Sequence, residues 1–197
     1  MADILSVARS ELILGGQRSG KSRRAELIAR AWMSKDPANQ SVMIATAQAW
    51  DDEMRERISR HQADRIERVP GMRTVEEPID PGEALARHTA PRTLVVIDCL
   101  TLWLTNLLMP APIQAEAAGV QAGHMVDTQT ARLLLAIQNA TGPVVLVGNE
   151  IGLGVIPLGR ETRHFVDALG RLNQQVAATS SRVTLMAAGL PLTLKDI

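Results

Sequence analysis

The sequence has little of what marks three large protein classes: paired cysteines, long apolar runs and an excess of charge. Its one cysteine, Cys99, cannot form an internal disulfide. Nowhere do about 18 consecutive apolar residues occur, the length that a membrane-spanning helix needs. Lysine and arginine number 21, as do aspartate and glutamate, so the formal net charge is zero. We therefore expect no membrane span and no nucleic-acid partner.

Length and composition predict a single domain. The chain has 197 residues, 46% of them hydrophobic, which is enough for one substantial core. We expect residues 1–10 to be an amino-terminal extension and residues 11–197 to form the domain. The first residues lack the basic segment and apolar run of an export signal, so we expect a cytoplasmic protein.

Gly15–Ser22 fits the phosphate-binding pattern G-x-x-x-x-G-K-[S/T] and has the expected flanks. The apolar run Glu11–Leu14 predicts a buried parallel strand before it. Apolar residues at helical spacing in Arg23–Met33 predict a helix whose amino terminus points at the loop. Glycines let successive backbone N–H groups face one anion, and the helix dipole adds to their field. The sequence therefore predicts a nucleotide-binding site.

Individual roles within this loop follow from side-chain chemistry. Lys21 is expected to reach the β- and γ-phosphates, and the Ser22 hydroxyl to ligate the accompanying Mg²⁺. Arg18 is either a further phosphate contact or a solvated surface cation. The residues expected to bind nucleotide here are Gly15, Gly16, Gln17, Arg18, Ser19, Gly20, Lys21 and Ser22.

Strand-like and helix-like segments alternate along the chain. The expected strands after the first are Ser41–Thr46, Arg73–Val75, Thr93–Asp98, Val144–Gly148 and Arg182–Ala188. The expected further helices are Asp52–Ile66, Glu83–His88, Leu100–Leu108, Val126–Asn139 and Glu161–Thr179. This alternation predicts an α/β fold, a mainly parallel sheet with helices on both faces. With the phosphate-binding loop, it predicts the three-layer P-loop NTPase fold of the RecA-like kind. Pro110–Gly123 is expected to be a poorly ordered connection, either a lid or a loop insertion.

Two acidic residues follow predicted central strands. Asp98 ends an apolar strand, the Walker-B arrangement in which a carboxylate orients Mg²⁺; it could instead cap the next helix. Glu150 follows the strand Val144–Gly148 and could act as a base, contact a metal ligand or cap a helix. The loop motif favours the metal role for Asp98, while the role of Glu150 stays open.

A polar helix face carries the one histidine with strongly basic neighbours. Arg57, His61, Asp64 and Arg65 lie at positions i, i+4, i+7 and i+8 of the helix predicted from Asp52. A neutral imidazole there could attack the α-phosphorus of a nucleotide and form a phosphoramidate. The alternative is a salt-bridged helix surface, which spacing alone favours. The other histidines lack the partners of a zinc site.

Seven segments in order resemble one family, that of the bifunctional adenosylcobinamide kinase/adenosylcobinamide-phosphate guanylyltransferases of cobalamin biosynthesis. The resemblance covers about residues 11–195. The matching segments are Gly15–Ser22, Ile44–Gln48 with Asp51–Met54, Arg57–Arg65, Asp98–Leu108, Asn149–Pro157, Arg163–Gln174 and Gly189–Pro191. Asp98 stands where some relatives carry Glu, and Val166 stands where we expect Arg.

The resemblance implies two reactions at one nucleotide site. A nucleoside triphosphate, ATP or GTP, phosphorylates the aminopropanol hydroxyl of adenosylcobinamide. GTP then guanylylates His61, which passes GMP to adenosylcobinamide phosphate and gives adenosylcobinamide-GDP. The resemblance also implies Mg²⁺, a homotrimer and Asp98 in the Walker-B position. It places GTP contacts at Ala45, Thr46, Ala47, Gln62, Ala63, Asp64, Arg65 and Glu76.

Two other functions remain open at this stage. A monofunctional small-molecule P-loop kinase would share every expectation except the covalent intermediate on His61. A regulatory GTP-binding switch would need a guanine-reading Asn-Lys-x-Asp element after a late strand. The corresponding stretch, Gly148–Ile151, does not have that sequence, which counts against the switch.

Overall fold

A computed structural model of the protein describes residues 5–109 and 122–197. The strands are β1 (Ser10–Gly15), β2 (Gln40–Ala45), β3 (Arg73–Glu76), β4 (Thr93–Asp98), β5 (Val144–Val147), β6 (Arg182–Ala187) and β7 (Leu190–Asp196). The helices within the described residues are α1 (Lys21–Lys35), α2 (Asp52–Arg68), α3 (Pro81–His88), α4 (Leu100–Leu108), α6 (Ala122–Asn139) and α7 (Arg160–Thr179).

All strands belong to one seven-stranded sheet with the order β3-β2-β4-β5-β1-β6-β7. Every neighbouring pair is parallel except β6 and β7, which form an antiparallel hairpin at one edge. The predicted α/β fold with a mainly parallel sheet is confirmed. Because parallel strands end on the same side, the loops that follow β1, β2, β3, β4 and β5 gather at the carboxyl edge of the sheet.

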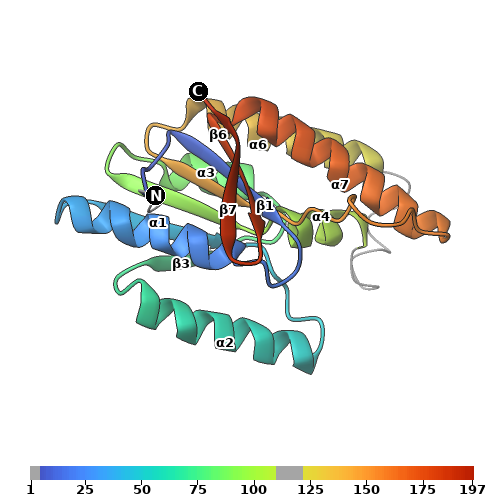
Figure 1. Cartoon of the computed structure of the whole chain (residues 1–197), viewed down its shortest axis with the longest axis horizontal. Helices are drawn as coiled ribbons and strands as arrows, with labels where there is room; N and C mark the ends of the chain where they lie inside the picture. Colours follow the sequence, from blue (N-terminus) through green and yellow to red (C-terminus); the bar gives the residue numbers. More distant parts are fainter. Residues whose placement is uncertain (1–4, 110–121) are drawn as a thin grey trace.

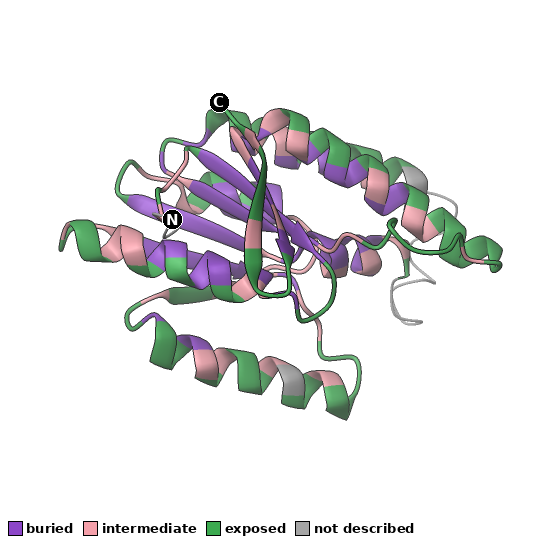
Figure 2. Cartoon of the chain, in the orientation of Figure 1, coloured by how far each residue is buried: buried purple, intermediate pink, exposed green. Residues whose placement is uncertain are grey.

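Helices cover both faces of this sheet, so the molecule has three layers (Figure 1). The strands alternate between two cores as the period of two requires: Leu12 and Leu14 face one core, whereas Ile13 faces the other. Buried side chains of α3, α4, α6 and α7 complete the first core, and those of α1 complete the second. Figure 2 shows the buried central strands between the half-buried helices.

The predicted elements are confirmed with shifts of a few residues at their ends. The main difference is at α6, which begins at Ala122 and so takes the last two residues of the connection expected over Pro110–Gly123. The other residues of that connection lie outside the described ranges. In the described part of the chain, no helix is both long and apolar enough to cross a membrane.

Candidate nucleotide-binding site

The phosphate-binding loop leaves the carboxyl end of β1 in a conformation that its glycines permit. Gly15 is tightly enclosed, because a Cβ there would lie 2.5 Å from the carbonyl oxygen of Met186 and 2.6 Å from Ser19 Oγ. Gly20, the residue before α1, has a φ of 98°, which side chains rarely allow. Arg18 has a φ of 56° and is exposed. The backbone therefore curls back on itself between strand and helix, as predicted.

The amino terminus of α1 differs from those of α2, α3 and α4, and shares with that of α7 a glycine that gives no side-chain cap. Asp51, Asp80 and Cys99 each cap the following helix by accepting a hydrogen bond from a backbone N–H group. At α1 the capping position is Gly20, which provides no side-chain hydrogen bond. The first N–H groups of a helix need acceptors, and an anion supplies them well. This helix end is therefore built to receive an anion.

Lys21 lies over the loop that precedes it. Its side chain is 8% exposed, and Nζ donates hydrogen bonds to the carbonyl oxygen of Gly16 at 2.5 Å and to Ser19 Oγ at 3.5 Å. A cation held at this position meets the phosphates of a nucleotide seated in the loop. The half-buried Ser22 follows it in the first turn of α1.

The β6–β7 hairpin supports this loop, a role that our sequence reasoning missed. Ala188 and Gly189 form its turn with φ values of 52° and 80°. The Gly189 N–H donates to the carbonyl oxygen of Ser19 at 3.1 Å, and a Cβ on Gly20 would lie 3.4 Å from the Gly189 Cα. A two-residue turn with glycine between strands is a hairpin signal, so the sequence did contain the information.

Asp98 ends β4 at the same edge, half-buried, and the turn after it is held by Thr46. Thr46 is fully buried. Its Oγ1 accepts a hydrogen bond from Cys99 N–H at 2.8 Å and donates one to the Cys99 carbonyl oxygen at 2.7 Å. Asn106 Nδ2 in turn donates to the Thr46 carbonyl oxygen at 2.8 Å. The resemblance placed Thr46 among the GTP contacts, and in the structure its hydroxyl hydrogen-bonds the turn at Asp98–Cys99.

The Cys99 thiol beside Asp98 is protonated and therefore unreactive at ordinary pH. Burial, assisted by the neighbouring Asp98 carboxylate, raises the pKa of Cys99 to about 12. Its Sγ accepts a hydrogen bond from the Leu102 N–H at 3.4 Å. The neutral thiol therefore serves as packing and as a weak cap for α4.

Gly148–Glu150 continue β5 between the phosphate-binding loop and Asp98. Val147 is paired with Ile13 on one side and with Asp98 on the other. Beyond it, Glu150 N–H donates to the carbonyl oxygen of Gly15 at 3.1 Å. The half-buried Glu150 therefore lies beside the first residue of the loop.

The helix α2 brings His61 toward this edge. Gln62 contacts Glu76 at 3.5 Å and Arg65 contacts Thr74 at 3.1 Å, so α2 runs antiparallel to β3 and begins at the carboxyl side of the sheet (Figure 1). His61 is exposed and, within the described residues, makes no hydrogen bond or ion pair. The strand β3 is four strands from β1, or about 19 Å at the usual strand spacing.

The remaining predicted contacts follow the strand ends in the same row. Ala45 and Ala47 flank Thr46 at the end of β2 and are half-buried. Glu76 ends β3 and is exposed. On α2, Ala63 is exposed and Asp64 accepts a hydrogen bond from Arg68 at 2.8 Å. The predicted residues thus lie along one sheet edge, from β3 to β1.

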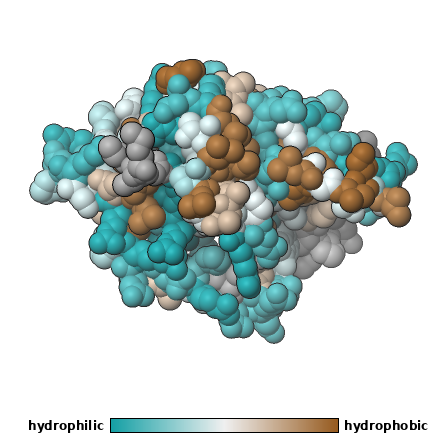
Figure 3. Space-filling view, in the orientation of Figure 1, coloured by the Kyte–Doolittle hydropathy of each residue, from teal (hydrophilic) through white to brown (hydrophobic). Residues whose placement is uncertain are grey.

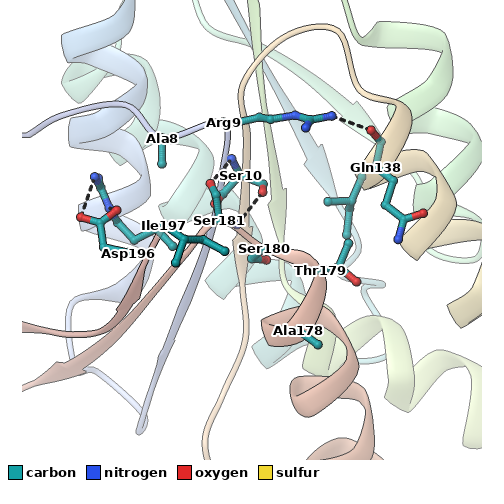
Figure 4. A pocket seen from close by; sticks show the side chains of 12 residues that line it. Ala8, Arg9, Ser10, Gln138, Ala178, Thr179, Ser180, Ser181, Asp196 and Ile197 are labelled. Atoms are coloured by element: carbon teal, nitrogen blue, oxygen red, sulfur yellow. Dashed lines mark hydrogen bonds and ion pairs between the residues drawn. The ribbon is translucent and has the colours of Figure 1, made fainter.

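A pocket of about 560 Å³ lies at the opposite, amino edge of β1 and β6 (Figure 4). Its polar side chains bond to the protein: Ser181 Oγ donates to the Ser10 carbonyl oxygen at 2.8 Å, and Arg182 pairs with Asp196 at 3.1 Å. Because it lies at the opposite edge of the sheet, this pocket is separate from the phosphate-binding loop.

Sequence comparison accounts for this combination of loop, acidic strand end and histidine helix. Residues 11–194 match the family described as cobinamide kinase / cobinamide phosphate guanyltransferase, CobU. The chain belongs to the CobU family. The match spans every element from β1 to β7, so the family resemblance read from the sequence is confirmed.

Three curated relatives support membership of the CobU family. The bifunctional adenosylcobalamin biosynthesis protein CobP of Pseudomonas aeruginosa is 42% identical over 94% of this chain and 96% of its own length. The proteins named CobU from Escherichia coli and Salmonella typhimurium are 36% and 35% identical, each over 93% of this chain and 98% of the relative.

A solved structure supports the fold of this CobU-family chain. This structure, an ATPase domain, superposes with a TM-score of 0.52 over 90% of this chain and 69% of the other, at 12% sequence identity. At that identity the likeness concerns the fold, and it agrees with the predicted P-loop architecture.

Proposed function

We propose that this protein phosphorylates adenosylcobinamide with a nucleoside triphosphate and then transfers GMP from GTP to adenosylcobinamide phosphate. The observation that carries the proposal is the row of strand ends from β3 to β1, which presents the phosphate-binding loop, Asp98 and the His61 helix on one edge. Membership of the CobU family supports both activities.

In the kinase step the triphosphate lies in the loop Gly15–Ser22. The aminopropanol hydroxyl oxygen of adenosylcobinamide attacks the γ-phosphorus, the bond from that phosphorus to the β,γ-bridging oxygen breaks, and a nucleoside diphosphate leaves. Lys21 and the first N–H groups of α1 stabilise the charge on the phosphoryl oxygens.

In the transfer step GTP extends along the row of strand ends toward β3. A ring nitrogen of His61 attacks the α-phosphorus and pyrophosphate leaves, so GMP is held through a phosphorus–nitrogen bond. A phosphate oxygen of adenosylcobinamide phosphate then attacks the same phosphorus, the phosphorus–nitrogen bond breaks, and adenosylcobinamide-GDP forms. Glu76, Gln62, Ala63, Asp64, Arg65 and Ala45–Ala47 are the proposed GTP contacts outside the loop.

The donor set suits Mg²⁺ with both nucleotides. The Ser22 hydroxyl in the first turn of α1 and the Asp98 carboxylate at the end of β4 are half-buried oxygen donors, and Mg²⁺ prefers oxygen ligands. When bound, the ion neutralises charge on the phosphates and orients them. Asp98 stands where some relatives carry Glu, and aspartate retains the carboxylate that this role needs.

We further propose that residues 11–197 form a single catalytic domain and that the protein works as a cytoplasmic homotrimer. Apolar side chains on the surface support assembly: Leu153, Val155, Ile156 and Leu158 are 76–97% exposed, and Leu190, Leu192 and Leu194 on β7 are 57–71% exposed. Figure 3 shows apolar side chains gathered over β7 and beside the start of α7.

The test follows the covalent intermediate. Purified protein is incubated with Mg²⁺ and GTP labelled at the α-phosphate, denatured, and examined for acid-labile protein-bound label. We expect label on the wild type and none on His61→Ala, because the nucleophilic nitrogen is gone. The kinase activity of His61→Ala should persist.

A matched control is His164→Ala, which removes another exposed histidine, this one on α7. It should label as the wild type does. A His61→Ala protein that keeps full guanylyltransferase activity would refute the role of His61. Kinase activity without label in the wild type would instead support the monofunctional kinase.

A further inference from the structure

Glu150 follows β5, the strand that lies between the phosphate-binding loop and Asp98, the two groups proposed to hold the triphosphate and its Mg²⁺. The sheet order places β5 between β4, which ends in Asp98, and β1, which leads into the loop. Val147 at the end of β5 has Asp98 and Ile13 as its direct neighbours. The segment that follows β5 therefore leaves the sheet between the loop and the proposed metal ligand.

The backbone of this segment is fixed on both sides. Toward β1, Gly148 N–H donates to the Ile13 carbonyl oxygen at 2.9 Å and Glu150 N–H donates to that of Gly15 at 3.1 Å. Toward α4, Asn149 N–H donates to Thr101 Oγ1 at 2.8 Å. From α7, Asn173 Nδ2 donates to the Asn149 carbonyl oxygen at 3.0 Å.

Such anchoring is more than a connecting loop requires, and it holds the Glu150 carboxylate in place. Glu150 Oε1 accepts a hydrogen bond from Gly152 N–H at 2.7 Å. In the part of the chain that the structure describes, Oε2 has no protein partner and the carboxylate pairs with no cation. Among the other acids near this edge, Asp64 pairs with Arg68 and Glu77 binds two backbone N–H groups, whereas Asp98 is the proposed metal ligand.

We propose that Glu150 is the proton acceptor for the attacking hydroxyl in the phosphorylation step, an inference that rests on the proposed kinase activity. As the hydroxyl oxygen bonds to the γ-phosphorus, its proton passes to a carboxylate oxygen of Glu150. The electron pair of the breaking phosphorus–oxygen bond leaves with the nucleoside diphosphate. The protonated Glu150 then returns the proton to solvent, because the residue is half-exposed.

The transfer step makes no such demand on Glu150. A neutral imidazole nitrogen attacks through its lone pair, so no hydroxyl proton has to be removed at the α-phosphorus. The inference therefore predicts that the two activities separate when the carboxylate is neutralised.

The experiment compares full-length wild type, Glu150→Gln and the control Glu161→Gln, which changes an exposed glutamate in the first turn of α7. Phosphate transfer from γ-labelled triphosphate to adenosylcobinamide gives kcat and KM, and α-labelled GTP reports guanylylation of His61. Glu150→Gln should lower the kinase kcat about 100-fold or more with little change in the triphosphate KM. Glu150→Gln should still label His61.

Glu150→Asp keeps a carboxylate on a shorter side chain and should recover part of the lost kcat. The inference is overturned if Glu150→Gln matches the control in kinase kcat, or if Asp and Gln variants are equally impaired. Loss of both phosphate transfer and label in Glu150→Gln also overturns it, because the residue would then support nucleotide binding. A wild type that transfers no phosphate would fail the proposed kinase activity itself.

Discussion

The amino and carboxyl edges of the sheet differ in whether their polar groups have hydrogen-bond partners within the protein. At the amino edge, Lys195 Nζ donates to three carbonyl oxygens at the end of α7, the nearest at 2.6 Å, and Ser10 and Ser181 bond reciprocally. At the carboxyl edge, the first turn of α1 has no side-chain cap and one oxygen of Glu150 has no partner within the described residues. The named groups at the first edge stabilise the fold, whereas the uncapped turn of α1 and the second oxygen of Glu150 are available for a ligand.

The largest effect that this comparison predicts is at Lys21. Lys21→Ala removes the cation that faces the phosphates in both reactions, so phosphorylation and His61 labelling should each fall by at least about 100-fold. Lys35→Ala, at the exposed last residue of the same helix, is the matched control and should retain both activities. Steady-state assays and the labelling assay measure this. Near-normal turnover in Lys21→Ala would show that the loop does not hold the triphosphate.

Thr46 tests whether the carboxyl edge also contains purely positioning groups. Thr46→Val keeps the shape but leaves the buried Cys99 N–H without its acceptor, which should cost about 1–3 kcal/mol of unfolding free energy. The Asp98 turn should loosen, raising the Mg²⁺ concentration needed for half-maximal activity. Urea unfolding and a Mg²⁺ titration measure the two effects. Thr46→Ser retains the hydroxyl and should lie near the wild type; equal losses in both variants would contradict the hydrogen-bond explanation.

Lys195 provides the corresponding test at the amino edge. Lys195→Met removes the donor to the terminal carbonyl groups of α7 and should lower the unfolding free energy by about 1 kcal/mol. Because this edge is remote from the phosphate-binding loop, kcat for both reactions should stay at the wild-type value. Denaturant unfolding and the two assays together give the result. A large loss of activity at unchanged stability would mean that the amino edge takes part in function.

The sequence predicted most of the carboxyl edge because its chemistry is local. Gly15–Ser22 and Asp98 belong to short motifs whose backbone geometry depends on neighbouring residues, and the alternating apolar runs predicted the strands that carry them. The partnership of Thr46 with Cys99 joins residues 53 positions apart, and the support of Ser19 by Gly189 joins the two ends of the chain. Such pairings depend on strand order, which the hydrophobic periodicity of the sequence does not specify. The distance from His61 to the loop likewise depends on how five strands, from β3 to β1, lie side by side.

Replacing Cys99 should have the smallest effect on stability and activity, because its thiol is neutral and buried at ordinary pH. Its pKa rises from 9.0 to about 12 on folding. The unfolded chain therefore loses this proton first, so the contribution of Cys99 to stability is complete below pH 9 and is lost as the pH rises toward 12. A thiol reagent at pH 8 should react slowly with the folded protein and quickly after unfolding in urea. Cys99→Ala provides the blank, and its unfolding free energy should decline less between pH 9 and 10 than that of the wild type. Rapid labelling of the folded protein would show that the Asp98–Cys99 turn opens to solvent, and the carboxyl edge would then be less rigid than its hydrogen bonds to Thr46 indicate.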